Sequence, residues 1–260
     1  MTNPNFWHVI AAIYISDLFR YVLAAGSVFV LLWKVLRRRV EYRRINLEYP
    51  PAAQLRREFA YSMSTVAIFA ATGFLIYSLA AAGVLTVYTR ISDYGWAYWV
   101  LSLLAMIILH DAYFYWTHRA LHYPAIFRRV HAVHHRSRNP SPWAAYAFHP
   151  FEALIQAAFL PLILFIMPVH AGVIFLFTSH MIVRNALGHS GVEIYPRNAV
   201  RNPSLGWLTS TTHHHLHHET VHNNYGLYFS WWDRWMGTQN PNYFGAFDAV
   251  TQRSPIRTAP

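Results

Sequence analysis

Long apolar segments constrain the fold of this chain more than any other feature of its sequence. Residues 7–36, 61–88 and 96–122 are each long enough to cross a bilayer, which takes about 20 helical residues. Residues 151–188 are apolar again around a break at Pro168. Charged residues make up only 12% of the chain, whereas a soluble domain carries about 25%. The pattern predicts an all-α integral membrane protein with about four to five hydrophobic helical segments.

The order of these segments predicts two full spans, a third long span and a helical hairpin. The third span is expected to continue beyond the lipid as a helix until Pro124 ends it, so that its last turns project from the membrane. Pro161 interrupts the first limb of the hairpin, which can therefore be re-entrant. Asp17 and Arg20 lie three residues apart inside the first span and are expected to face each other or the bundle.

The net charge of +10 comes almost wholly from arginine, since Lys34 is the only lysine. Seven arginines lie in residues 37–57, whereas the link 89–95 carries one. The positive-inside rule therefore places the arginine-rich loops in the cytoplasm, which suggests a multi-pass protein of the cytoplasmic membrane. The arginines lie beside apolar segments without a nucleic-acid-binding motif, so the expected partner of the basic surface is the lipid bilayer and not nucleic acid.

The chain contains no cysteine, which excludes disulfides, iron–sulfur clusters, thiolate zinc sites and a cysteine nucleophile. Any metal site must therefore use nitrogen and oxygen ligands. No basic region precedes the first apolar segment, so we expect that segment to be retained and not cleaved as a signal peptide.

Histidines are concentrated in residues 211–226, where six of them lie within ten residues. Neutral imidazole is a common ligand for transition metals and a poor filler for a hydrophobic core. The run contains the spacing H-x-x-H-H, as His214, His217 and His218. Residues three and four apart share a face of a helix, so these three imidazoles can converge on one point.

Two further clusters have the same helical spacing. A pair of histidines four residues apart ends the third span, and a second H-x-x-H-H follows it. The topology drawn from hydropathy and arginines alone places all these clusters, and the end of the hairpin, on the cytoplasmic side. The sequence thus predicts a cytoplasmic helical cap that holds nine candidate metal ligands: His118, His122, His131, His134, His135, His189, His214, His217 and His218.

Nine imidazoles suggest two metal ions, because one ion takes about three to six ligands. Imidazole suits iron, zinc, copper and nickel. A membrane enzyme with such a site can meet unactivated C–H bonds of lipids, whose oxidation needs a redox-active metal and O2. Zinc cannot supply that chemistry, so the context favours an oxidising metal.

Other polar residues near the clusters are expected to have supporting roles. Asp111 lies seven residues before His118, on nearly the same helical face, and is a candidate acceptor for the N–H of a ligand imidazole. His213, His215 and His222 point away from the face of the H-x-x-H-H spacing, and they and Glu219 are candidates for similar support or for weak ligation.

The remaining histidines are assigned no ligand role. His110 lies within the third span and is expected to be packed or hydrogen-bonded. His149 can stand near the site but has no helical partner, and His8 and His170 lie elsewhere.

An ordered set of motifs runs through the second half of the chain. They are H-R-x-x-H (His118 to His122), H-x-x-H-H (His131 to His135), A-x-x-x-H-P-x-E (Ala145 to Glu152), G-H-S (Gly188 to Ser190), H-x-x-H-H (His214 to His218), N-Y-G (Asn224 to Gly226) and W-D-R-x-x-G-T (Trp232 to Thr238). Over about residues 96–240 the set resembles the fatty acid hydroxylase/sterol desaturase superfamily, most closely the sterol C5-desaturase branch and its bacterial relatives.

The resemblance implies a non-haem centre of two iron ions that uses O2 to hydroxylate or desaturate a lipid. It also implies an electron donor, such as a cytochrome b5- or ferredoxin-type protein with its reductase, and it assigns the ligand roles to the nine histidines named above. Zinc can replace iron in such a site. Where some relatives have a further histidine, this chain has Asn185, four residues before His189, so a weak or water-mediated ligand can complete one metal shell.

Three parts of the chain are expected. Residues 1–95 form N-terminal transmembrane helices with a basic cytoplasmic loop, residues 96–240 form the catalytic domain, and residues 241–260 form a C-terminal tail that is frayed over its last dozen residues.

Alternative interpretations fit parts of the same pattern. His218-Glu219-Thr220-Val221-His222 matches H-E-x-x-H, in which two histidines hold zinc and the glutamate is the base, so a membrane zinc metallohydrolase is one alternative. A non-catalytic metal-binding or metal-transporting membrane protein is another, although transport favours ligands near the bilayer midplane. A b-type haem held by two histidines is a third.

Overall fold

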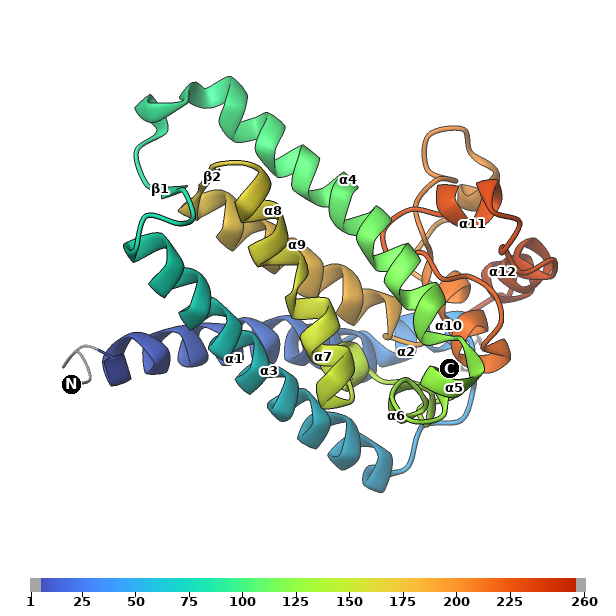
Figure 1. Ribbon diagram of the computed structural model, residues 1–260. Helices are drawn as coiled ribbons and strands as arrows, with labels where there is room; N and C mark the ends of the chain where they lie inside the picture. The colour runs from blue at the N-terminus through green and yellow to red at the C-terminus, as the bar shows by residue number, and fades with distance from the viewer. Residues whose placement is uncertain (1–5, 256–260) are drawn as a thin grey trace.

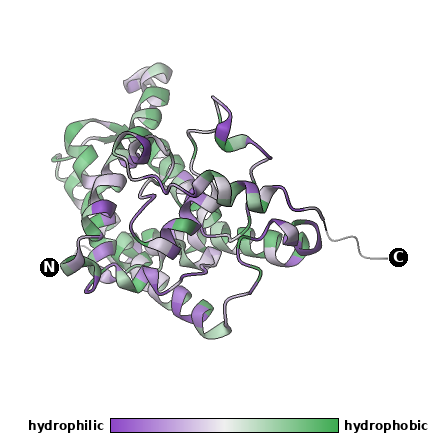
Figure 2. Cartoon of the chain, turned by 90° about the vertical axis from the view of Figure 1, so that its right-hand side faces the viewer, coloured by the Kyte–Doolittle hydropathy of each residue, from purple (hydrophilic) through white to green (hydrophobic). Residues whose placement is uncertain are grey.

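Long apolar helices form a bundle, and short helices and loops form a cap at one end of it (Figure 1). The computed structural model describes residues 6–255. In the view from the capped end, hydrophilic residues are concentrated in the short helices and loops, whereas hydrophobic residues dominate the long helices (Figure 2). This segregation is what a bilayer-embedded bundle with one water-exposed end requires.

The N-terminal half consists of three long helices and short connecting elements. Their bounds are α1 (Phe6–Val30), η1 (Leu31–Val35), α2 (Arg37–Val40), η2 (Glu41–Arg43), α3 (Ala52–Ala81), β1 (Val87–Tyr88), η3 (Ile91–Asp93) and α4 (Gly95–Leu121). The second half contains the hairpin and most of the cap. Its elements are α5 (Pro124–Phe127), α6 (Ala132–His135), η4 (Pro142–Tyr146), α7 (Pro150–Ala157), α8 (Phe159–Ile166), β2 (Val169–His170), α9 (Ala171–Gly188), η5 (Ala199–Arg201), α10 (Thr211–Thr220), α11 (Trp231–Trp235) and α12 (Tyr243–Thr251).

Four helices are long and apolar enough to cross a membrane: Phe6–Val35, Ala52–Ala81, Gly95–Leu121 and Ala171–Gly188. A shorter apolar helical segment, Pro150–Ile166, precedes the last of them and consists of α7 and α8, with Ala158 between them. The predicted all-α membrane protein with four to five hydrophobic segments is therefore confirmed.

The second span lies about two turns earlier in the sequence than hydropathy predicted, at Ala52–Ala81 instead of 61–88. It begins directly after Pro51, which has an extended backbone conformation. Proline is common at helix starts because the first N–H groups of a helix have no partner within it. Its first turns are polar and lie in the cap, where the Gln54 amide donates to the Asn139 carbonyl over 2.8 Å. It ends before Gly83, whose φ of +74° suits glycine and stops the helix.

Two contacts between the first helices and η4 position the site. Tyr21 Oη in α1 and Ser62 Oγ in α3 both donate to the carbonyl oxygen of Trp143, each over 2.9 Å. The Tyr146 ring stacks on Tyr21, with centroids 5.5 Å apart. The loop that follows the second histidine cluster is thereby fixed to the membrane bundle.

At the opposite end of the bundle, β1 and β2 pair in parallel, with Val87 opposite Val169 and Tyr88 opposite His170. Tyr98 Oη in α4 also donates to the Pro168 carbonyl over 2.8 Å. These bonds hold the tip of the α8–α9 hairpin against the link between the second and third spans (Figure 1).

The predicted C-terminal tail, 241–260, contains a packed helix. Tyr243 and Phe247 of α12 are buried against Ala199 and Val200 and contact Leu216 of α10. Their apolar spacing of four residues places them on one helical face, which the prediction of a tail overlooked. Residues 256–260 lie outside the described part of the chain.

Candidate metal centre

Four parts of the chain bring the nine predicted histidines to the capped end of the bundle. They are the end of α4, the segment around α6, the residue that ends α9, and α10. The N-terminus of α10 is fixed by Ser210, whose hydroxyl accepts from the backbone N–H of His213 over 3.2 Å, as expected for a helix N-cap. Local helix signals thus position ligands that are up to about 100 residues apart in sequence.

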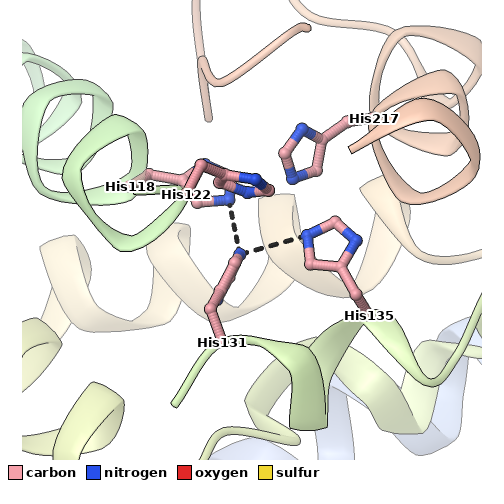
Figure 3. A group of neighbouring side chains, drawn as sticks. All are labelled: His118, His122, His131, His135 and His217. Atoms are coloured by element: carbon pink, nitrogen blue, oxygen red, sulfur yellow. Dashed lines mark hydrogen bonds between the residues drawn. The ribbon is translucent and has the colours of Figure 1, made fainter. Parts of the chain in front are cut away.

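The first group contains five imidazoles: His118, His122, His131, His135 and His217. One nitrogen of each ring lies within 4.8 Å of the corresponding nitrogen of every other ring (Figure 3). The Nε2 atom of His131 lies 3.0 Å from Nε2 of His118 and 3.1 Å from Nε2 of His135. All but His122 are buried.

The second group contains the other four imidazoles, His134, His189, His214 and His218, all buried. The Nε2 atom of His189 lies 3.0 Å from Nε2 of His214, 3.2 Å from that of His218 and 3.3 Å from that of His134. The two groups are adjacent, since the rings of His135 and His218 lie 4.9 Å apart between centroids.

Hydrogen bonds at the outer ring nitrogens determine which nitrogen is free. His118 Nδ1 donates to the Tyr225 carbonyl over 2.9 Å, and His189 Nδ1 donates to the Asn185 carbonyl over 2.8 Å. Because a carbonyl only accepts, Nδ1 of both rings carries the proton, and Nε2 of a neutral ring then presents a lone pair to its group. His217 Nδ1 donates in the same way to the Asn223 carbonyl over 2.7 Å.

The buried rings are held in the neutral form. Burial, and then the neighbouring imidazoles, keep the pKa of five rings well below the ordinary histidine value: His131, His134, His214, His217 and His218. Neutral imidazole is the form that binds a metal ion, so burial prepares these rings as ligands.

The geometry fits a pair of transition-metal ions. Lone pairs of neutral rings repel each other at 3.0–3.3 Å unless a cation lies between them. Nitrogens bound to one ion at about 2.1 Å are themselves about 3.0–3.4 Å apart in octahedral or tetrahedral arrangements. Nε2 of His122 and of His217 also has no hydrogen-bond partner among residues 6–255, although both atoms are buried. A metal ion between the rings would supply the missing partner of these atoms.

A loop of four residues after α10 supplies two of the carbonyls that orient ligand rings. The Asp233 carboxylate accepts from the backbone N–H groups of Tyr225 and Gly226, each over 2.8 Å. A Cβ at Gly226 would lie 2.4 Å from the Phe229 carbonyl oxygen and 2.9 Å from Asp233 Oδ2, so the loop requires glycine there. The N-Y-G and W-D-R motifs are therefore joined by hydrogen bonds. Together they position the Tyr225 carbonyl, which accepts from His118, and the nearby Asn223 carbonyl, which accepts from His217.

Glu152 is a site residue that sequence reasoning missed. Its Oε1 lies 2.8 Å from Nδ1 of His131, and both side chains are buried. A carboxylate on the outer nitrogen fixes the ring orientation of a metal-binding histidine and raises its basicity. The glutamate was visible as the last residue of A-x-x-x-H-P-x-E, but the sequence offered no spacing that linked it to His131.

Asp111 supports the site differently from the prediction. Its Oδ1 accepts from the backbone N–H groups of Tyr228 and Phe229, over 2.8 and 3.2 Å, and its Oδ2 accepts from Trp231 Nε1 over 2.8 Å. The carboxylate therefore holds the segment after the N-Y-G loop, and it forms no hydrogen bond with an imidazole in the described chain.

Asn185 uses its side chain to fix the structure around the second group. Its Nδ2 donates to the Ala145 carbonyl over 2.7 Å, while its backbone carbonyl accepts from His189. His213 is buried, lies 3.4 Å from Asp233 Oδ2 and packs on Tyr243, so it supports the carboxylate that holds the loop. The buried His215 lies outside both imidazole groups.

The H-E-x-x-H match does not form a zinc-hydrolase site. α10 ends at Thr220, and Val221 adopts a left-handed conformation with φ of 57°, so His222 does not share a helical face with His218. His222 and Glu219 are exposed, whereas His218 is buried in the second group. The metallohydrolase alternative is therefore not favoured.

Three histidines without a predicted ligand role have hydrogen-bond partners. His110 Nδ1 lies 3.0 Å from Tyr228 Oη, which confirms that His110 is hydrogen-bonded. His149 and His170 cap α7 and α9, where their Nδ1 atoms accept from the backbone N–H groups of Phe151 and Gly172.

Fold and site together define an all-helical integral membrane protein with two adjacent, buried, all-histidine groups at one end of its bundle. Comparison with known proteins gives the family. Residues 103–238 match the fatty acid hydroxylase family model, so the chain belongs to this family. The matched region contains all nine histidines of the two groups.

Individual relatives are sterol-oxidising enzymes by name. The chain is 35% identical over 152 residues to a Delta(7)-sterol 5(6)-desaturase of Gibberella zeae, a match that covers 58% of this chain and 45% of the relative. It is 29% identical over 211 residues to a Delta(7)-sterol 5(6)-desaturase of Aspergillus fumigatus, covering 74% and 66%, and 28% identical over 198 residues to human lathosterol oxidase, covering 74% and 63%. The matches thus span about half to two thirds of the length of these relatives. No solved structure matches the chain significantly.

Proposed function

We propose that this protein is a membrane-bound, O2-dependent oxidoreductase that hydroxylates or desaturates a lipid at a centre of two iron ions. The observation that carries the proposal is the pair of adjacent imidazole groups, in which Nε2 atoms of different rings lie 3.0 Å apart, as in His118 with His131 and in His189 with His214. Membership of the fatty acid hydroxylase family and the sterol desaturases among the relatives support the same reaction class.

The nine histidines would hold the two ions, five in the first group and four in the second. When bound, iron supplies the redox chemistry with O2 that no side chain of this protein can provide. The chain orients the rings through Glu152 and the carbonyls of Asn185, Asn223 and Tyr225. Burial excludes bulk water from the groups, which protects an oxidising centre from side reactions.

We propose that residues 96–240 carry this chemistry and that residues 1–95 anchor and complete the membrane bundle. The capped end then faces the cytoplasm, in line with seven arginines in the 37–57 connection and one in the 89–95 link. The cytoplasmic membrane is the proposed location.

A basic surface beside the site supports an acidic electron donor, such as a cytochrome b5- or ferredoxin-type protein. Five exposed arginines lie within, between and directly after the first two ligand clusters: Arg119, Arg128, Arg129, Arg136 and Arg138. Such a surface raises the association rate of an acidic protein, and salt screens the effect. Reversal of charge at Arg128 and Arg129 should slow reduction by either donor at low salt, and rising ionic strength should remove the difference.

The decisive experiment measures lipids directly. Purified protein in lipid nanodiscs, loaded with ferrous iron and supplied with O2 and a chemical reductant, is incubated with a total lipid extract, and mass spectrometry searches for a gain of one oxygen or a loss of two hydrogens. We expect such a product from the wild-type chain and none from a His131→Ala, His134→Ala variant that removes one imidazole from each group. Iron bound by both groups without any change in a lipid would contradict the proposal.

A further inference from the structure

A cavity of about 220 Å³ lies inside the membrane bundle, among α1, α3, α4, α7, α8 and α9. Its walls are mostly apolar and include Phe69, Ile76, Phe159 and Phe177. Pockets that enclose a whole small ligand measure about 300–1,000 Å³, so this cavity fits a part of a lipid. Its walls from α1 and α3 lie outside residues 103–238, the part of the chain that matches the family.

One polar side chain of the cavity wall has no partner. Gln156 is only 9% exposed, and neither its Nε2 nor its Oε1 forms a hydrogen bond within the described chain. A buried amide without partners destabilises the fold, because its polar atoms lose their hydrogen bonds to water and gain none in return, so such a group calls for an explanation. A polar atom of a bound ligand would supply the missing partner.

The two free atoms of Gln156 indicate the chemistry of that ligand. Its Nε2 can only donate and its Oε1 can only accept, so a ligand group that both accepts and donates can give each of the two atoms a partner. A hydroxyl does both, whereas a ketone or ester carbonyl would leave Oε1 unpaired. The apolar remainder of the wall fits a hydrocarbon attached to that hydroxyl.

The charged residues of the wall favour a neutral ligand. Arg20 donates to Asp17 and to Thr178 Oγ1, and its guanidinium lies 5.5 Å from the centroid of the Phe175 ring. The predicted pairing of Asp17 with Arg20 is thus confirmed, and each charge is already compensated. Ionisable residues inside a membrane span are costly and mark functional surfaces, yet this pair has no net charge to offer an anionic headgroup.

We propose that this cavity binds the hydroxyl-bearing part of the lipid substrate and that the Gln156 amide is the residue that recognises the hydroxyl. The inference rests on the proposed function and adds the substrate class, a neutral lipid alcohol. Gln156 lies one helical turn after Glu152 in α7, which is a rise of about 6 Å along the helix. Because Glu152 contacts His131, α7 connects the hydroxyl site with the first imidazole group.

The test measures binding and needs no turnover. The full chain in phosphatidylcholine nanodiscs is labelled with two photoreactive probes, a sterol alcohol and a straight-chain C16 alcohol, each in competition with its unlabelled alcohol and with the matching methyl ether. A methyl ether keeps the acceptor but loses the donor. We expect the alcohol to compete at least about tenfold better than its ether for one of the two skeletons, because the ether leaves Oε1 buried and unpaired. Labelled peptides should come from the helices that line the cavity.

The variant Gln156→Leu should reduce the ratio between alcohol and ether to about one, whereas Gln252→Leu, the same change at an exposed position on the far side of the cap, should keep it. The skeleton that shows the preference tells whether the cavity fits a sterol or an open chain. Equal competition by alcohol and ether in the wild-type chain, or labelling outside the cavity helices, would overturn the inference whatever the variants do. If the protein oxidises a lipid but shows no preference for the alcohol over its ether, the proposed function stands and the hydroxyl site is wrong. If the protein prefers the alcohol but the iron-loaded protein oxidises no lipid, only the proposed function is contradicted.

Discussion

At the scale of single residues, the site depends on what the outer nitrogens of its rings touch. Three rings, His118, His189 and His217, donate to backbone carbonyls, and His131 faces the carboxylate of Glu152. A backbone carbonyl cannot be removed by substitution of a side chain. Glu152 is therefore the orienting group that mutagenesis can test directly.

Substitution of Glu152 by Gln should weaken metal binding in the first group. An amide can still accept from His131 Nδ1, but it lacks the negative charge that raises the basicity of the ring, and loss of such an outer partner costs about 10–100-fold in metal affinity or activity. Competition with a chelator, followed by metal analysis of the protein, measures the change. Unaltered affinity in a correctly folded variant would show that the carboxylate has no role in the site.

Substitution of Glu219 by Gln should leave metal content and lipid oxidation unchanged. Glu219 is exposed on α10 and contributes to neither imidazole group. The variant also serves as the matched control for Glu152→Gln, because both replace a glutamate by its amide. Loss of activity with intact metal binding would instead revive the hydrolase interpretation, in which this residue is the base.

At the scale of elements, α10 lies between metal ligands and a hydrophobic support. His214, His217 and His218 face the groups, while Leu216 contacts α12 at Tyr243 and Phe247. The C-terminal helix α12 thus packs against the helix that carries these three histidines and stabilises its position.

Replacement of Phe247 by Ala should destabilise the cap by about 3–5 kcal/mol, the usual cost of deleting a buried phenylalanine side chain. Because α10 loses its support, bound metal should be released at a lower temperature. Metal release during thermal unfolding and limited proteolysis of the cap measure the effect. Phe244→Ala, on the same helix but only partly buried, is the control and should cause a smaller loss. Equal effects of the two variants would contradict the role of α12.

Elements and ligands were predictable from the sequence to different degrees. The length of the apolar segments identified the spans, and helical periodicity identified the histidine clusters, because residues three or four positions apart share a helical face. The assignment of His134 to one group and its neighbour His135 to the other was not predictable, since it depends on how α6 lies between α4 and α10. The contact of Glu152 with His131 was missed for the same reason: it joins segments whose relative positions only packing determines.

At the scale of the whole molecule, the two ends of the bundle differ in character. The capped end carries the imidazole groups and most arginines, whereas the other end has a short parallel β-ladder and a link with the single arginine Arg90. The proposed topology therefore has a simple experimental consequence.

The natural absence of cysteine allows each side of the membrane to be labelled selectively. Arg38 and Ser92 are exposed at opposite ends of the bundle, so Arg38→Cys should be protected from a membrane-impermeant maleimide in intact cells, and Ser92→Cys should react. Both should react after permeabilisation, which is the control for accessibility. The reverse pattern would place the imidazole groups on the outer side of the membrane and exclude a cytoplasmic electron donor.

The distribution of ligands along the chain determines when the centre can be assembled in a living cell. The first group needs His217, and the second needs His214 and His218, so both stay incomplete until α10 has been synthesised. By then all four candidate membrane-spanning helices have been synthesised, since the last of them, α9, ends at Gly188. If the two groups bind metal as proposed, its insertion must be a late step in biogenesis, and a chain that stops before α10 would contain neither group complete.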